Sequence, residues 1–268
     1  PTPTPTPTPI PTAIPTPSPV PVIKANKLCL NYGHQTNDYD LSDLGPVKND
    51  LDKIKSSGIS CLRIAYGDWN YSGMLDLAKF AKSNGFRVIL GGHYGDVSED
   101  DFSSYRNKVI KQAKWAQANN IDQFSLGNEQ EFKLSTSKEN WYNFLIDLSA
   151  EVDKVYSGVT SYETSGTFFD FWLEKSLGKI DKLGFNMYSG YGTNATRIQE
   201  YISIHGANRV YVSETNADLD IKNFPLLELG IPIYYFTYST CTGTEKYWGL
   251  YQCGDFAQPK TANVLGIK

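Results

Sequence analysis

The chain has 268 residues, 40% hydrophobic and 13% aromatic, which is enough for one large domain with a substantial core. Its 25 basic and 29 acidic residues are intermixed and give a net charge of −4, so the sequence lacks the basic surface that binds nucleic acid or an anionic membrane. No run approaches the ~20 apolar residues of a membrane-spanning helix. We therefore expect a neutral partner, and the many aromatic rings are typical of saccharide-binding clefts. The chain is expected to be a monomer.

Residues 1–22 form a segment dominated by Pro-Thr repeats, with ten of the fourteen prolines of the chain. Such a segment has few backbone donors and little to bury, so it is predicted to stay extended and solvated. Pro-Thr spacers commonly tether the modules of secreted polysaccharide-degrading enzymes. We expect an extracellular protein with a neighbouring module before this spacer, a disordered tail without a neighbour being the alternative. The start shows no signal-peptide pattern, so we expect a piece of a longer precursor.

The folded domain is predicted to span 23–268, where short apolar runs alternate with amphipathic stretches. The predicted strands are 28–32, 61–66, 87–92, 124–128, 159–163, 183–188, 210–213 and 233–238. The predicted helices are 47–57, 71–84, 102–119, 138–156, 171–177, 195–205 and a weaker one at 224–229. Apolar strands each followed by a helix indicate a parallel sheet covered on its outside.

Eight such units fit a closed (β/α)8 TIM barrel, whose typical size is ~250 residues. An open doubly wound sheet is the alternative. It is disfavoured because no Gly-rich phosphate loop follows the first strand, where residues 31–34 read Asn-Tyr-Gly-His.

Barrel enzymes build their active sites at the C-terminal ends of the strands. In this chain, Glu129 and Glu214 end the fourth and seventh predicted strands. Two carboxylic acids facing each other across a sugar ring are what glycosidic cleavage needs, one to protonate the leaving oxygen and one to attack the anomeric carbon or activate water. We therefore predict Glu129 and Glu214 as a catalytic pair.

Strand alternation predicts which neighbours of the two glutamates share their face. If Glu129 points into the barrel, Ser125 and Gly127 point there too, and if Glu214 does, residues 210 and 212, both Val, follow it.

These strand ends resemble those of clan A, the retaining (β/α)8 glycoside hydrolases that include cellulases, mannanases and β-1,3-glucanases. In that clan the acid/base Glu follows an Asn at the end of strand four, as in Asn128-Glu129, and the nucleophile ends strand seven, as Glu214 does. Arg63 on strand two and Tyr188 on strand six match positions that support the nucleophile. The resemblance covers about residues 26–268. It implies that Glu129 is the acid/base and Glu214 the nucleophile.

Six side chains at strand ends and in loops are expected to contact substrate together with Arg63 and Tyr188: Trp69, His93, Asn128, Asn186, Tyr238 and Trp248. Many relatives end strand eight with a Trp that floors the central sugar site, whereas this strand ends Tyr-Tyr-Phe-Thr-Tyr. The resemblance therefore assigns the floor to Tyr238 or Trp248. Glu131 is interpreted as a loop residue or distal sugar contact, and Glu163 as a substrate ligand or an alternative catalytic partner.

The sequence thus predicts a secreted retaining endo-β-glycanase that needs no metal or organic cofactor. Its expected substrate is a β-1,4-glucan such as cellulose, with β-mannan and β-1,3-glucan as alternatives. Transglycosylation uses the same residues, and a barrel that binds carbohydrate without cleaving it is the alternative from another class.

The four cysteines allow two pairs. Cys241 and Cys253 flank a loop rich in Gly and Thr and suit a local disulfide in an exported protein. Cys29 and Cys61 lie in the first two predicted strands, where either buried free thiols or a bridge is expected.

Overall fold

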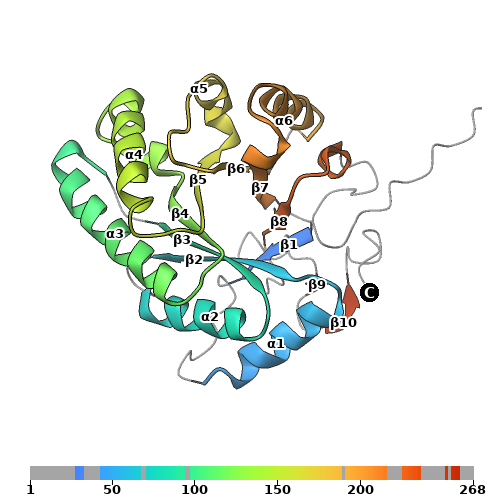
Figure 1. Ribbon diagram of the computed structural model, residues 1–268. Helices are drawn as coiled ribbons and strands as arrows, with labels where there is room; N and C mark the ends of the chain where they lie inside the picture. Colours follow the sequence, from blue (N-terminus) through green and yellow to red (C-terminus); the bar gives the residue numbers. More distant parts are fainter. Residues whose placement is uncertain are drawn as a thin grey trace, which may run out of the picture.

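The computed structural model of the chain describes residues 28–32, 43–67, 71–93, 97–188, 191–215, 225–236, 251–252 and 255–259. Within them the eight predicted strands form a closed barrel in which each strand runs parallel to both neighbours and β8 pairs back to β1 (Figure 1). The strands are β1 (Leu28–Asn31), β2 (Cys61–Gly67), β3 (Arg87–His93), β4 (Gln123–Asn128), β5 (Val159–Ser165), β6 (Lys182–Asn186), β7 (Val210–Thr215) and β8 (Ile233–Tyr235). The (β/α)8 prediction is confirmed, and the open sheet is wrong.

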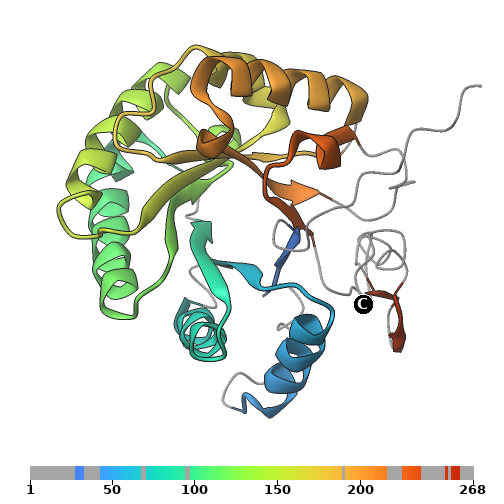
Figure 2. The same ribbon diagram turned by 45° about the vertical axis from the view of Figure 1, so that its right-hand side comes forward.

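Helices surround the strands on the outside, as Figure 2 shows. The α-helices are α1 (Gly45–Ser56), α2 (Tyr71–Ser83), α3 (Phe102–Ala118), α4 (Lys138–Val152), α5 (Phe169–Leu173) and α6 (Tyr191–His205). The 3-10 helices are η4 (Glu99–Asp101), η5 (Gln130–Lys133), η6 (Gly166–Phe168), η7 (Ala207–Arg209) and η9 (Pro225–Leu229). The weak helical pattern at 224–229 thus forms a 3-10 helix. In the described ranges, none of the helices combines the length and apolar character needed to span a membrane.

The sequence sets the helix boundaries through a buried stripe and glycine stops. In α1, the side chains of Val47, Leu51 and Ile54 recur at helical spacing and are buried against the strands. The chain after α1 and α2 then turns through Gly58 (φ 88°) and Gly85 (φ 83°). These left-handed conformations favour glycine, and they return the chain to the next strand within a few residues. A short antiparallel ribbon of β9 (Tyr251–Gln252) and β10 (Asp255–Pro259) lies outside the barrel.

A disulfide joins Cys29 on β1 to Cys61 on β2, with Cα atoms 4.9 Å apart. Both residues are buried in an apolar cluster with Ile89, Tyr211 and Tyr234, separate from the larger core under the helices. The sequence allowed either a disulfide or two free thiols at these positions, and the structure contains the disulfide. Cys241 and Cys253 lie outside the described residues.

We expect the double variant Cys29→Ala/Cys61→Ala to be less stable by about 3–4 kcal/mol, because the bond closes a loop of 32 residues in the unfolded chain. Guanidinium unfolding of the two proteins measures the difference as a lower midpoint, with a steeper slope because the unfolded chain without the bond is more expanded. An unchanged midpoint would show that the bridge does not constrain the unfolded chain.

Candidate active site

Glu129 directly follows β4 and leaves the strand in a left-handed conformation, with φ 52° and ψ 33°. Its backbone N–H donates to the carbonyl oxygen of Glu163 on β5 (2.9 Å), and its own carbonyl accepts from the N–H of Phe132 (3.2 Å). For a residue other than glycine this conformation is uncommon and costs about 1–3 kcal/mol, and such residues cluster at functional sites. The turn aims Glu129 independently of the strand's alternation.

The alternation predicted for β4 is half right. Ser125 points into the barrel, where its hydroxyl donates to the carboxylate of Glu163. Gly127 faces α3 instead, because a Cβ on it would lie 2.3 Å from the hydroxyl oxygen of Tyr105. The register with β5 shifts between Ser125 and Asn128, and this irregularity interrupts the period of two. The prediction for Gly127 is therefore wrong, and glycine is needed there so that α3 can approach the strand.

The alternation predicted for β7 is wrong for the same physical reason. Val210 and Val212 belong to the core under the helices, whereas the Tyr211 hydroxyl donates to Glu163 inside the barrel. Just before Glu214 the register between β6 and β7 shifts by one residue. This bulge re-aims the chain, so that Glu214 shares the inner face with Tyr211 despite the odd spacing between them.

Glu214 is held by a cation and a hydroxyl. Arg63 Nη1 donates to its Oε1 at 2.8 Å, and the Tyr188 hydroxyl donates to its Oε2, so both supporting contacts expected from the sequence are present. Glu214 is 7% exposed. Burial and the charge of Glu214 raise the pKa of the Tyr188 hydroxyl, which keeps it a donor. These partners fix the orientation of the Glu214 carboxylate and place a cation against it.

Arg63 connects three elements inside the barrel. Its Nη1 also donates to Asn31 Oδ1 (2.7 Å), and the Asn31 amide donates in turn to the backbone carbonyl of Ser213 (2.8 Å). Its Nη2 lies 3.8 Å from Glu163 Oε2. Burial alone would lower the pKa of Arg63, but Glu214 and Glu163 outweigh it and raise the pKa. The guanidinium is therefore a fixed positive charge under the nucleophile candidate.

Glu163 lies beneath the site. It is fully buried and accepts hydrogen bonds from Ser125, Ser161 (3.1 Å) and Tyr211. A molecule bound at the barrel mouth does not reach a carboxylate enclosed in this way. The interpretation of Glu163 as a substrate ligand or catalytic partner is wrong. Its carboxylate instead supports Arg63 from below.

The surroundings of Glu129 favour the protonated form of its carboxyl group. Burial, followed by the charge of Glu214, raises the pKa of Glu129 to about 7, while a hydrogen bond with Asn186 and the charge of Arg63 act in the other direction. A carboxyl group with this pKa carries a proton in a large share of molecules near neutral pH. The site thus holds a carboxyl group that is protonated in a large share of molecules beside a second one that is bound by Arg63 and Tyr188.

Asn186 connects the strand ends around Glu129. Besides its hydrogen bond to Glu129, its Nδ2 donates to Asn128 Oδ1 (3.1 Å) and its Oδ1 accepts from the Ser213 hydroxyl (2.6 Å). Asn128 and Asn186 are only 2% and 3% exposed. The two amides predicted to contact substrate therefore lie in a network that positions Glu129.

Glu131 anchors the turn that follows Glu129. It is buried, with hydrogen bonds from Tyr162 (2.7 Å), Thr164 (2.8 Å) and Trp172 (2.8 Å). Burial raises its pKa, against the effect of these donors. The sequence left Glu131 as either a loop residue or a distal sugar contact. Because all its hydrogen bonds are internal, it is a structural residue of the loop.

Four of the predicted substrate contacts have no described side chain. Trp69, Tyr238 and Trp248 lie outside the described residues, as does the spacer at 1–22. His93 ends β3 as predicted, but its side chain lies outside the description. Among the described residues, no group of His, Cys, Asp and Glu side chains is arranged to hold a metal ion.

Sequence reasoning placed Ser125 inside the barrel and singled out Glu163, but it missed that they form a buried polar cluster with Ser161 and Tyr211. One signal was available, since Ser161 and Glu163 are two residues apart on one strand and share a face. Tyr211 carried no such signal, because the bulge on β7 hides the face on which it lies.

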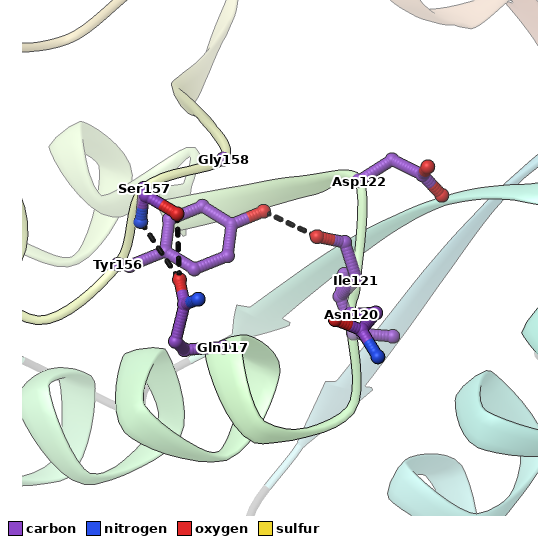
Figure 3. A pocket seen from close by; sticks show the side chains of 7 residues that line it. All are labelled: Gln117, Asn120, Ile121, Asp122, Tyr156, Ser157 and Gly158. Carbon is purple, nitrogen blue, oxygen red and sulfur yellow. Dashed lines mark hydrogen bonds between the residues drawn. The ribbon is translucent and has the colours of Figure 1, made fainter.

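A pocket of about 210 Å³ lies at the other end of the barrel, where β4 and β5 begin (Figure 3). It is lined by Gln117, Asn120, Ile121, Asp122, Tyr156, Ser157 and Gly158. The Gln117 side-chain oxygen accepts from the backbone and hydroxyl of Ser157, and the Tyr156 hydroxyl donates to the Ile121 carbonyl. These bonds close the turns before the two strands, far from the carboxylate pair.

No model of a protein family matches the sequence, and no curated protein matches it. Solved structures do share the fold. A GH113 β-1,4-mannanase aligns with a TM-score of 0.62 at 15% identity, covering 90% of this chain and 96% of that chain. A cellulase solved with an inhibitor aligns with a TM-score of 0.61 at 14% identity, covering 81% and 85%.

An active-site mutant of the Rhizomucor miehei β-1,3-glucanosyltransferase, solved with laminaritriose, aligns with a TM-score of 0.58 at 15% identity, covering 84% of this chain and 93% of that chain. At these identities the three likenesses show the barrel fold.

Proposed function

We propose that the chain is a retaining glycoside hydrolase that cleaves a β-linked polysaccharide. The observation that carries the proposal is the contrast between two neighbouring glutamates at the strand ends. The pKa of Glu129 is raised to about 7, whereas Glu214 is bound by Arg63 and Tyr188. A protonated acid beside a stabilised carboxylate is the pair that glycosidic cleavage requires.

Each glutamate has one role in each half of the reaction. Glu214 attacks the anomeric carbon while Glu129 gives its proton to the departing glycosidic oxygen, which leaves a sugar covalently bound to Glu214. Glu129 then takes a proton from water, whose oxygen attacks the same carbon and releases Glu214. Two inversions at one carbon retain its configuration. Arg63 and Tyr188 orient Glu214 for attack. They donate to its carboxylate again when the second half of the reaction releases it from the sugar.

The proposed substrate is a β-1,4-linked hexose polymer, cellulose being our first candidate. A β-1,4-mannan has equal support, because a mannanase and a cellulase both share the fold. The glucanosyltransferase neighbour supports β-1,3-glucan and transfer to a second sugar as further candidates.

Turnover of carboxymethyl-cellulose, β-mannan and β-1,3-glucan by the purified chain tests the proposal and ranks the substrates. Release of reducing ends from at least one polymer is expected, and products longer than the starting oligosaccharide at high sugar concentration would identify transfer. Binding without turnover across the whole panel would identify a non-catalytic carbohydrate-binding barrel.

The pH dependence of kcat/KM follows from Glu129. Because only its protonated form can donate to the leaving oxygen, kcat/KM should be highest below pH 7 and fall about tenfold per pH unit above it. A pH series on the polysaccharide that is turned over measures this limb. Full activity at pH 9 would contradict the assignment of Glu129 as the acid.

We further propose that the chain acts outside the cell beside a second module. The Cys29–Cys61 bond supports an oxidising compartment, and the Pro-Thr segment at 1–22 suits a spacer. Immunodetection in the medium and in cell extracts of the native host tests this, since a chain found only inside cells would contradict it.

A further inference from the structure

Two large hydrophobic side chains are exposed in the part of the chain that the structure describes, Phe132 (57%) and Ile204 (53%). Exposure of a single apolar side chain is ordinary. What distinguishes Phe132 is its place in η5, three residues after Glu129, at the end of the barrel where the strands finish. Ile204 lies near the end of α6, a helix that starts at that mouth and runs to the opposite end.

The backbone that carries Phe132 is fixed. Its N–H donates to the carbonyl of Glu129 (3.2 Å), which closes one turn between the two residues. Glu131, its neighbour, is buried with three hydrogen bonds. On the other side, the N–H of Val97 donates to the Lys133 carbonyl (3.0 Å). The backbone that carries the exposed ring is thus held at a set position relative to Glu129.

A second ring supports Phe132 from the neighbouring strand end. The ring centroid of Phe168, in η6 after β5, lies 4.9 Å from that of Phe132, at an interplanar angle of 59°. Phe168 is half-buried and packs on the main core, and Lys138 Nζ lies 5.3 Å from its ring centroid. The Phe132–Phe168 pair therefore presents one free aromatic surface on a supported base.

The chemistry of the site determines what lies over this surface. The nucleophile attacks the anomeric carbon opposite the departing oxygen, so the leaving sugar extends away from Glu214 and past the acid that protonates it. The segment directly after Glu129 continues from that acid at the barrel mouth. The C–H face of a β-linked hexose is apolar and flat, which suits stacking on an exposed aromatic ring.

We infer that Phe132, supported by Phe168, is a platform for a sugar on the leaving-group side of the scissile bond. The inference rests on the proposed hydrolase function and deepens it. Its ligand is a β-linked hexopyranose unit toward the reducing end of the substrate. The platform strengthens binding of polymer and of an acceptor sugar, and it takes no part in bond breaking.

Phe132→Ala tests the platform when two substrates are compared. One is the polysaccharide that the wild type turns over, and the other is the matching β-biosyl fluoride, whose leaving fluoride places no sugar on the platform. The ratio of kcat/KM on polysaccharide to kcat/KM on the fluoride should fall about tenfold in this variant, which corresponds to the loss of one aromatic contact. Phe132→Trp should restore the ratio, and Ile204→Ala, which removes an equally exposed side chain far from the mouth, should keep it.

Other outcomes overturn the inference. An unchanged ratio, with equal losses on both substrates or none, would show that Phe132 only supports Glu129 or has no role in binding. If the wild type turns over no polysaccharide of the panel and no biosyl fluoride, the proposed hydrolase is refuted instead. In that case calorimetric titration with cellohexaose and mannohexaose tests the platform, and equal affinity in wild type and Phe132→Ala overturns it.

Discussion

Glu214→Ala should lower turnover of polysaccharide by about 10⁴-fold or more, because no group remains to form the covalent intermediate. Azide should restore activity. The space left by the carboxylate faces the Arg63 guanidinium, which attracts a small anion. The azide nitrogen attacks the anomeric carbon as the leaving oxygen departs, and no second displacement follows. The product is then the α-glycosyl azide, with inverted configuration, and NMR of the isolated product identifies it.

Two further variants control this experiment. Glu214→Gln keeps the shape of the side chain, so its loss of activity separates chemistry from folding, because removing one partner of a buried ion pair can also destabilise the protein. Glu228→Ala removes an exposed glutamate from η9 and should neither lose activity nor respond to azide. Near-native activity of Glu214→Ala, or a β-glycosyl azide, would contradict the nucleophile assignment.

Glu129→Gln should separate substrates by their leaving groups. A sugar oxygen needs a proton to depart, so turnover of polysaccharide should fall about 10²–10⁴-fold while binding stays near normal. In a 2,4-dinitrophenyl β-glycoside the leaving group is dinitrophenolate, which departs without that proton. Formation of the glycosyl-enzyme from this substrate should remain fast, whereas its hydrolysis should be slow because Glu129 no longer activates the water. The difference appears as a burst of dinitrophenolate.

The same variant links the pKa to the mechanism. On polysaccharide, the residual kcat/KM of Glu129→Gln should lose the decline above pH 7, because the titrating group is gone. Glu131→Gln is the comparison, since this glutamate lies two residues along the same turn and is enclosed by Tyr162, Thr164 and Trp172. It should keep the leaving-group dependence of the wild type. An equal loss on every leaving group in Glu129→Gln would point to a binding defect.

The order of strands and helices was predictable because each strand is an apolar run that ends in polar residues. The same feature located Glu129 and Glu214 at the ends of β4 and β7, with Arg63 and Tyr188 nearby. In a parallel barrel all strand ends of one kind meet at one mouth, so position along the chain was enough to bring the two glutamates together, while the contacts of Arg63 and Tyr188 were expected from the family resemblance.

Only the tertiary structure decided how the side chains point and what lies beneath them. Period-two alternation assumes an uninterrupted ladder, and the register shifts in β4 and β7 broke it at the residues that matter most. The enclosure of Glu163 and the bond between Cys29 and Cys61 depend on which strands become neighbours when the barrel closes. Sequence therefore determined which residues reach the mouth, while long-range contacts determined the charge and direction that each of them has there.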